Sequence, residues 1–81
     1  MLETQLRRIL DGAKMVKFSE GRSEMVVWHG GTGFNVYSIY DGQVRERTMF
    51  TLSDEKGRPV SREEAVEHTE EWLRRRADAH A

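Results

Sequence analysis

Two arginines and a nearby tyrosine have residue types and a spacing suited to binding a partner. Arg45 and Arg47 alternate along one predicted strand, and Tyr37 lies on the preceding strand. Residues two apart on a strand share a face. Arginine beside an aromatic ring can stack on bases and bind phosphates, and the same residue types are enriched in protein interfaces. An ordinary solvent-facing strand has alternating polar residues as well. The residues predicted to contact a partner are Tyr37, Ile39, Arg45, Arg47 and Met49.

A glycine-rich segment, residues 29–33 with the sequence His-Gly-Gly-Thr-Gly, could hold an anion on its backbone amides. Phosphate-binding loops of this kind lead directly into a helix, whereas a strand-like sequence follows here. The segment also matches the His-Gly-Gly oxyanion loop of esterases, but the chain has no Gly-x-Ser-x-Gly motif to supply the nucleophile. We therefore interpret it as a connection between strands, with a secondary prediction of loop contacts by His29, Gly31 and Thr32.

The remaining reactive residue types do not form a catalytic or metal-binding pattern. The chain has no cysteine, which excludes disulfides and thiolate chemistry. His29, His68 and His80 lack the spacing that places two metal ligands on one helix face, so no metal site is predicted. Ser61 is interpreted as a helix cap, and the acidic residues between positions 63 and 71 as a solvated helix face. The chain is therefore predicted not to be an enzyme and to bind no cofactor.

Length and net charge limit the classes of function that the chain can have. A chain of 81 residues allows one small domain. Its 13 basic and 14 acidic residues give a net charge of −1, whereas proteins that coat nucleic acid are usually strongly basic. No stretch approaches the ~20 apolar residues that span a bilayer, and the charged first residues do not resemble a signal peptide. With no disulfides to support secretion, a cytoplasmic location is expected.

Hydrophobic periodicity predicts a helix, several strands and a second helix. Apolar residues at positions 2, 6, 9 and 10 mark one face of a helix that ends at Gly12. Residues 61–64 form a capping box for the last helix, whose apolar stripe also includes Arg76. We expect one α+β domain over residues 1–81, in which an antiparallel sheet of three to four strands has both helices packed on one face. The predicted elements are helix 3–11, strands 13–19, 24–29, 34–40 and 43–52, and helix 61–76, with 77–81 as a frayed tail and the place of 13–19 in the main sheet left open.

The turn at Asp41-Gly42 decides which side chains of this hairpin face the helices. A two-residue loop would pair even positions with odd ones, whereas a three-residue loop over 40–42 pairs even with even. Because the buried face sets the register, we predict the three-residue loop with a glycine bulge. It leaves Glu46 on the inward face, where it would need a strand end or a sheet edge. The residues expected on the inward face are Phe34, Val36, Val44, Phe50 and Leu52.

The preferred hypothesis is a small non-catalytic interaction or regulatory module. It would bind a protein partner, or a second copy of itself, through the open sheet face. The alternative is a nucleic-acid-binding accessory protein that uses the same arginines and aromatic residues. A third hypothesis is a small enzyme or ligand-binding protein acting through His29 and the glycine loop. The element order is shared with double-stranded-RNA-binding domains, but residues 62–64 are Arg-Glu-Glu where those domains start their last helix with basic residues. No membrane contact is expected.

Overall fold

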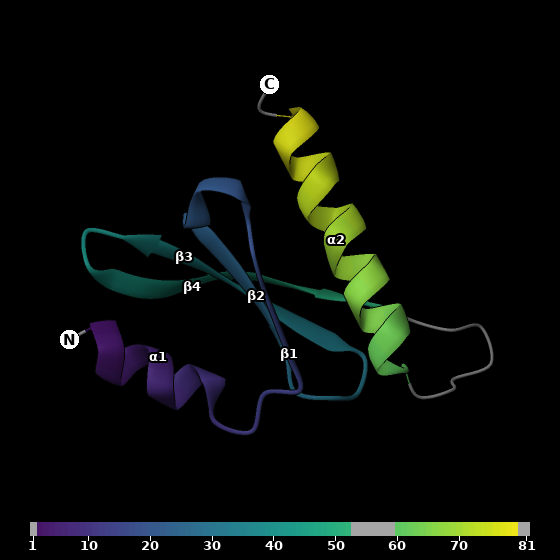
Figure 1. The fold of residues 1–81 in the computed structure, drawn as a ribbon, viewed down its shortest axis with the longest axis horizontal. Helices are drawn as coiled ribbons and strands as arrows, with labels where there is room; N and C mark the ends of the chain where they lie inside the picture. The colour runs from purple at the N-terminus through teal and green to yellow at the C-terminus, as the bar shows by residue number, and fades with distance from the viewer. Residues whose placement is uncertain (1, 53–59, 80–81) are drawn as a thin grey trace.

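The computed structural model describes residues 2–52 and 60–79. The chain forms two helices and one antiparallel four-stranded sheet with the strand order β1-β2-β3-β4 (Figure 1). The expected α+β class is confirmed, and the first strand does join the main sheet. The elements are α1 (Leu2–Leu10), β1 (Met15–Phe18), the 3₁₀ turn η1 (Glu20–Arg22), β2 (Glu24–Trp28), β3 (Gly33–Tyr40), β4 (Gln43–Thr51) and α2 (Arg62–Ala79).

Helix α2 covers one face of the sheet. The side chains on this face meet the helix in an aromatic stack, in which Phe50 lies 4.9 Å from Phe34 and 5.0 Å from Trp72, measured between ring centroids. Phe34 and Val36 are fully buried, and Phe50 and Leu52 pack against them. These four residues were all predicted to face inward, which is confirmed, whereas the prediction for Val44 was wrong, because it pairs with Ile39 on the other face of the sheet. The buried members of this core are Met15, Val26, Trp28, Phe34, Val36, Val60 and Ala65.

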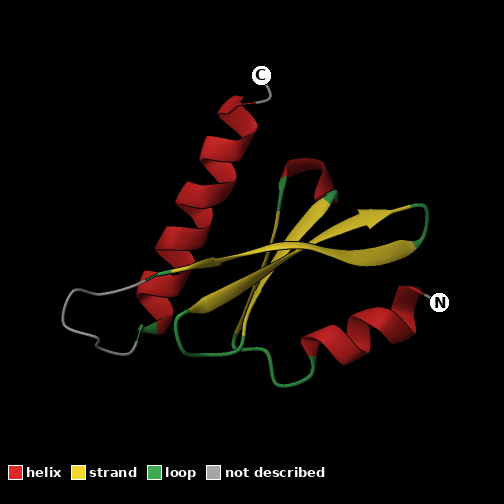
Figure 2. Cartoon of the chain, turned by 180° about the vertical axis from the view of Figure 1, so that it is seen from behind, coloured by secondary structure: helices red, strands yellow, loops and turns green. Residues whose placement is uncertain are grey.

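Helix α1 lies on the opposite face of the sheet (Figures 1 and 2). Met25 and Val27 alternate with the α2-facing residues of β2, so they point to the α1 side, and both have 0% exposure. At the edge of β4, the side-chain oxygen of Gln5 accepts a hydrogen bond from the Val44 amide at 3.1 Å. The helices thus sandwich the sheet, whereas the sequence predicted both on one face. The physical reason is that β2 is apolar on both of its faces, and each face needs a cover.

The β3–β4 hairpin turns through two residues, not the three that were predicted. Tyr40 pairs with Gln43, and both residues between them have positive φ: 50° at Asp41 and 68° at Gly42. Two successive positive φ angles define a type I′ turn, whose twist matches that of the flanking strands. The prediction of a three-residue loop is therefore wrong. It assumed a single register along the whole hairpin, whereas the Asp-Gly sequence favours a two-residue turn.

A register shift farther along the hairpin restores the burial pattern. Val36 pairs with Thr48 but the next residue, Tyr37, pairs with Glu46, so Arg47 is the additional residue of a β-bulge. Even positions pair with even ones beyond the bulge, and even with odd between the bulge and the turn. One bulge therefore reconciles a two-residue turn with a buried Phe34 and a half-buried Phe50. It also leaves Glu46 exposed, beside the turn end of the strand.

The start of α2 follows the predicted capping box. The Glu64 amide donates to Ser61 Oγ at 3.2 Å, and the Ser61 amide donates to a Glu64 carboxylate oxygen at 3.3 Å. The helix extends beyond its predicted end at Arg76 to Ala79, so the expected frayed tail is helical up to that residue. His80, also assigned to the tail, lies outside the described residues.

Candidate partner-binding groove

The structure divides the predicted partner-binding residues between two surfaces. By the strand register, Tyr37 and Ile39 lie on the α1 side of the sheet, where both are half-buried, although Ile39 also borders the groove described below. Met49 lies on the same side with 58% of its surface exposed. Arg45 and Arg47, in contrast, line a groove on the α2 side. The bulge at Arg47 causes this division. From Glu46 toward the turn, the even-numbered residues of β4 pair with the odd-numbered residues of β3, so Arg45 lies on the opposite face from Tyr37.

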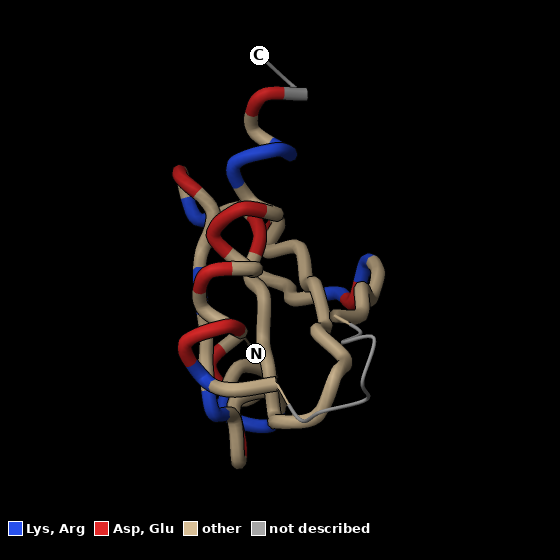
Figure 3. The backbone as a smooth tube through the Cα atoms, turned by 90° about the vertical axis from the view of Figure 1, so that its right-hand side faces the viewer, with Lys and Arg blue, Asp and Glu red and all other residues tan. Residues whose placement is uncertain are grey.

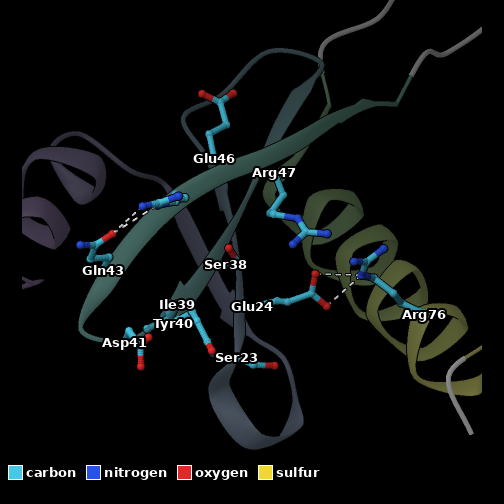
Figure 4. A pocket seen from close by; sticks show the side chains of 11 residues that line it. Ser23, Glu24, Ser38, Ile39, Tyr40, Asp41, Gln43, Glu46, Arg47 and Arg76 are labelled. Atoms are coloured by element: carbon cyan, nitrogen blue, oxygen red, sulfur yellow. Dashed lines mark hydrogen bonds and ion pairs between the residues drawn. The ribbon is translucent and has the colours of Figure 1, made fainter.

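The groove lies between the β3–β4 hairpin and the C-terminal half of α2 (Figure 4). Its volume is about 710 Å³. Its charged lining comes from three parts of the chain that lie far apart in the sequence, namely β2, the hairpin turn with the adjoining β4, and α2. The charged residues in it are Glu24, Asp41, Arg45, Glu46, Arg47 and Arg76.

An ion pair between β2 and α2 forms one wall of the groove. Arg76 Nε donates to both carboxylate oxygens of Glu24, at 2.8 Å each. Both side chains are largely shielded, with 32% exposure for Arg76 and 19% for Glu24. The Arg76 guanidinium also lies over the Trp72 ring, one helical turn earlier, at 5.3 Å from its centroid. The hydrogen bond that Arg76 donates to the Glu24 carboxylate raises the pKa of Arg76 above its ordinary value.

The arginines of β4 point in different directions. Arg47 extends toward Glu24 and Arg76 (Figure 4), whereas Arg45 bonds to Gln43, two residues earlier on its own strand. The Arg45 guanidinium donates to the Gln43 side-chain oxygen at 2.9 and 3.3 Å. The carboxylate of Glu46 points away from Arg47 (Figure 4). The inner part of the groove therefore places two guanidiniums next to one carboxylate, which leaves one positive charge in excess.

An exposed aromatic residue stands at the outer end of the groove. Tyr40, the last residue of β3, has 75% of its surface exposed and lines the groove together with Ile39. The tight turn that follows holds it at the tip of the hairpin. The groove thus combines a charged inner part with an aromatic and apolar rim.

Sequence reasoning missed Glu24, Tyr40 and Arg76 of this site. Arg76 had been placed in the apolar stripe of the last helix, and a charged residue on a buried face requires an ionic partner. The sequence therefore indicated that Arg76 needs an acidic partner. The identity of the partner could not be derived, because Glu24 and Arg76 are 52 positions apart in sequence.

The glycine-rich loop has structural contacts. The Trp28 indole donates to the Gly31 carbonyl oxygen at 3.0 Å, and the Leu52 amide donates to the Thr32 carbonyl oxygen at 2.9 Å. His29 Nε2 lies 3.1 Å from the carbonyl oxygen of Ile9, near the end of α1. The loop therefore connects β2, the end of β4 and α1. It lines neither the groove described above nor the second groove at the end of α2.

Within residues 2–52 and 60–79 no cluster of His, Asp and Glu side chains is arranged to hold a metal ion. Neither described helix is long and apolar enough to cross a membrane. His68 packs its ring against Phe34 and Phe50, at centroid distances of 6.1 and 5.5 Å. Comparison with protein-family models, with curated proteins and with solved structures finds no match for this chain.

Proposed function

We propose that this protein is a small non-catalytic interaction module that binds a protein partner through the groove between the β3–β4 hairpin and α2. The observation that carries the proposal is the convergence of Arg45, Arg47, Arg76 and the exposed Tyr40 on one groove. Arginine and tyrosine are the residue types enriched in protein interfaces and in their energetic centres. The contact surface moves to the α2 side of the sheet, because α1 covers much of the face that was expected to be open.

A binding role fits the chemistry of the groove better than catalysis. A general base needs a carboxylate or imidazole that can accept a proton from a substrate. Glu24, the most shielded carboxylate of the groove, instead accepts two hydrogen bonds from Arg76. We place the cysteine-free protein in the reducing cytoplasm, where its partner is another protein or a second copy of the chain.

Nucleic acid is a less suitable partner for this groove. Glu24 and Asp41 line the groove together with the arginines, and their charges reduce its attraction for the many phosphates of a nucleic acid. Where charged residues occur in the described chain, basic and acidic ones lie close together (Figure 3), and the net charge of the sequence is −1. Binding that depends on phosphates requires a concentration of positive charge.

Affinity capture from nuclease-treated lysate tests the proposal. The double variant Tyr40→Ala/Arg47→Glu should lose captured proteins that the wild type retains. Arg8→Glu, which makes the same charge change at an exposed position of α1, should retain them. Circular dichroism would verify that all three proteins fold, and light scattering would detect a second copy as the partner. Equal capture by both variants, or capture abolished by nuclease, would contradict the proposal.

A further inference from the structure

We infer that the groove recognises an acidic peptide segment, and that a carboxylate of this segment binds between Arg47 and Arg76. The inference rests on the proposed function, since it names the chemistry of the partner at the same groove. Three features of the groove support it: the Nη donors of Arg76, which have no partner within residues 2–52 and 60–79, the charge of the inner groove, and the aromatic rim.

The ion pair with Glu24 uses a small part of the donor capacity of Arg76. Both hydrogen bonds to Glu24 come from Nε. A guanidinium has five N–H groups, and the four on its Nη atoms lie outside that pair. The stack on Trp72 and the bond to Glu24 hold this fork in one orientation. A second carboxylate can therefore bind an arginine that is already ordered, which lowers the entropic cost of binding.

Arg47 is aimed at the same place by the backbone. As the additional residue of the β-bulge, it projects toward Glu24 and Arg76 (Figure 4). The two guanidiniums and the one carboxylate carry a net charge of +1. One carboxylate of a partner would neutralise this excess. A phosphate, with a charge of about −1.5 to −2 at neutral pH, would leave the same site with a net negative charge.

The rim of the groove indicates a peptide rather than a free anion. Tyr40 gives an exposed aromatic surface beside the charged inner part, with the half-buried Ile39 at its border. Tyr40 is 75% exposed, so it can be covered by a partner side chain. A segment with an acidic residue next to an apolar one would satisfy both parts of the groove. Burial of the tyrosine ring would add apolar contact to the charge-assisted hydrogen bonds.

An NMR titration with two matched peptides tests the inference. The probe is a capped hexapeptide of alternating leucine and glutamate, and the control peptide has glutamine in place of glutamate. The glutamate peptide should shift the Nε–Hε signals of Arg47 and Arg76, and the shifts should diminish with added salt. Arg47→Gln should weaken binding at least about tenfold, the equivalent of one lost charge-assisted hydrogen bond. Arg8→Gln, at an exposed position of α1, should bind as the wild type does.

Three results would overturn the inference: equal binding of both peptides, binding of neither, or shifts of the same arginine signals by a single-stranded oligonucleotide but not by the glutamate peptide. The outcome can be separated from that of the proposed function. If protein capture depends on Tyr40 and Arg47 while the glutamate peptide does not bind, the interaction module stands and the acidic partner is excluded. If the peptide binds but capture is unaffected by the same substitutions, the proposed function fails instead.

Discussion

The two faces of the sheet are buried by different means. On one face, the 18-residue helix α2 packs on a stack of aromatic rings and includes fully buried residues. On the other face, the 9-residue helix α1 covers Met25 and Val27 without any fully buried residue of its own. Isolated helices shorter than about 12–15 residues are marginal in water. The α2 face therefore carries most of the stability and also the groove, whereas α1 depends on the sheet for its structure.

The comparison predicts the largest loss of stability at the centre of the aromatic stack. Phe34 is fully buried and stacks with Phe50. Phe34→Ala should cost about 3–5 kcal/mol, which is a large part of the stability of so small a domain. Leu6→Ala, at a half-buried position of α1, should cost clearly less. Urea denaturation followed by circular dichroism measures both. Equal losses would mean that the two faces contribute equally, contrary to the comparison.

The second prediction concerns the ion pair that joins α2 to the sheet. Glu24→Gln keeps the size of the side chain but removes its charge, and should destabilise the fold by about 1 kcal/mol, since the pair is shielded but not fully buried. Glu71→Gln, which affects the exposed pair with Arg75 on the same helix, should change the free energy of unfolding by less than half of that.

The raised pKa of Arg76 fixes the pH dependence of that ion pair. A group whose folded-state pKa is raised contributes its stability below its unfolded pKa, and loses it only as the pH rises through the folded value. For an arginine, that loss lies at strongly alkaline pH. The difference in stability between the wild type and Glu24→Gln should therefore stay constant from neutral to mildly alkaline pH. A difference that disappeared over this range would show that Arg76 is not the relevant partner.

The third prediction is a gain of stability on the α2 face. The Thr69 side chain is fully buried against the sheet, and its Oγ1 has no hydrogen-bond partner among the described residues. Thr69→Val replaces this hydroxyl by a methyl group of similar size and should stabilise the protein by about 1 kcal/mol. Thr48→Val, at an exposed position of β4, should remain within about 0.5 kcal/mol of the wild type. A loss of stability in Thr69→Val would show that the hydroxyl is satisfied.

The contrast between the faces also explains what the sequence could predict. The capping box at Ser61 and the inward side chains of Phe34 and Val36 are local or periodic features, and the structure confirms them. The position of α1 was mispredicted although a signal for it exists. Residues 25–28 are apolar at four successive positions, a pattern typical of strands buried on both faces.

The groove was harder to predict, because its geometry depends on a register shift. Periodicity correctly required Phe34 and Phe50 to share a face, and the Asp-Gly turn favoured a two-residue loop. Only a bulge satisfies both, and its place at Arg47 follows from packing along the whole hairpin. The parity of Arg45 relative to Tyr37 could therefore not be derived from either signal alone.

The substitution with the smallest expected effect, Gln5→Ala, tests which contacts hold α1 on the sheet. Gln5→Ala removes the side-chain acceptor of the Val44 amide and should cost about 0.5 kcal/mol, the low end for a hydrogen bond. Because α1 is short and depends on such contacts, the loss should appear mainly as local opening rather than as global unfolding. Native-state hydrogen exchange should show faster exchange of α1 amides and of Val44, with the central amides of β2 and α2 unchanged. Uniformly faster exchange in both helices would mean that α1 and α2 unfold as one cooperative unit, and the difference between the two faces would then be one of burial alone.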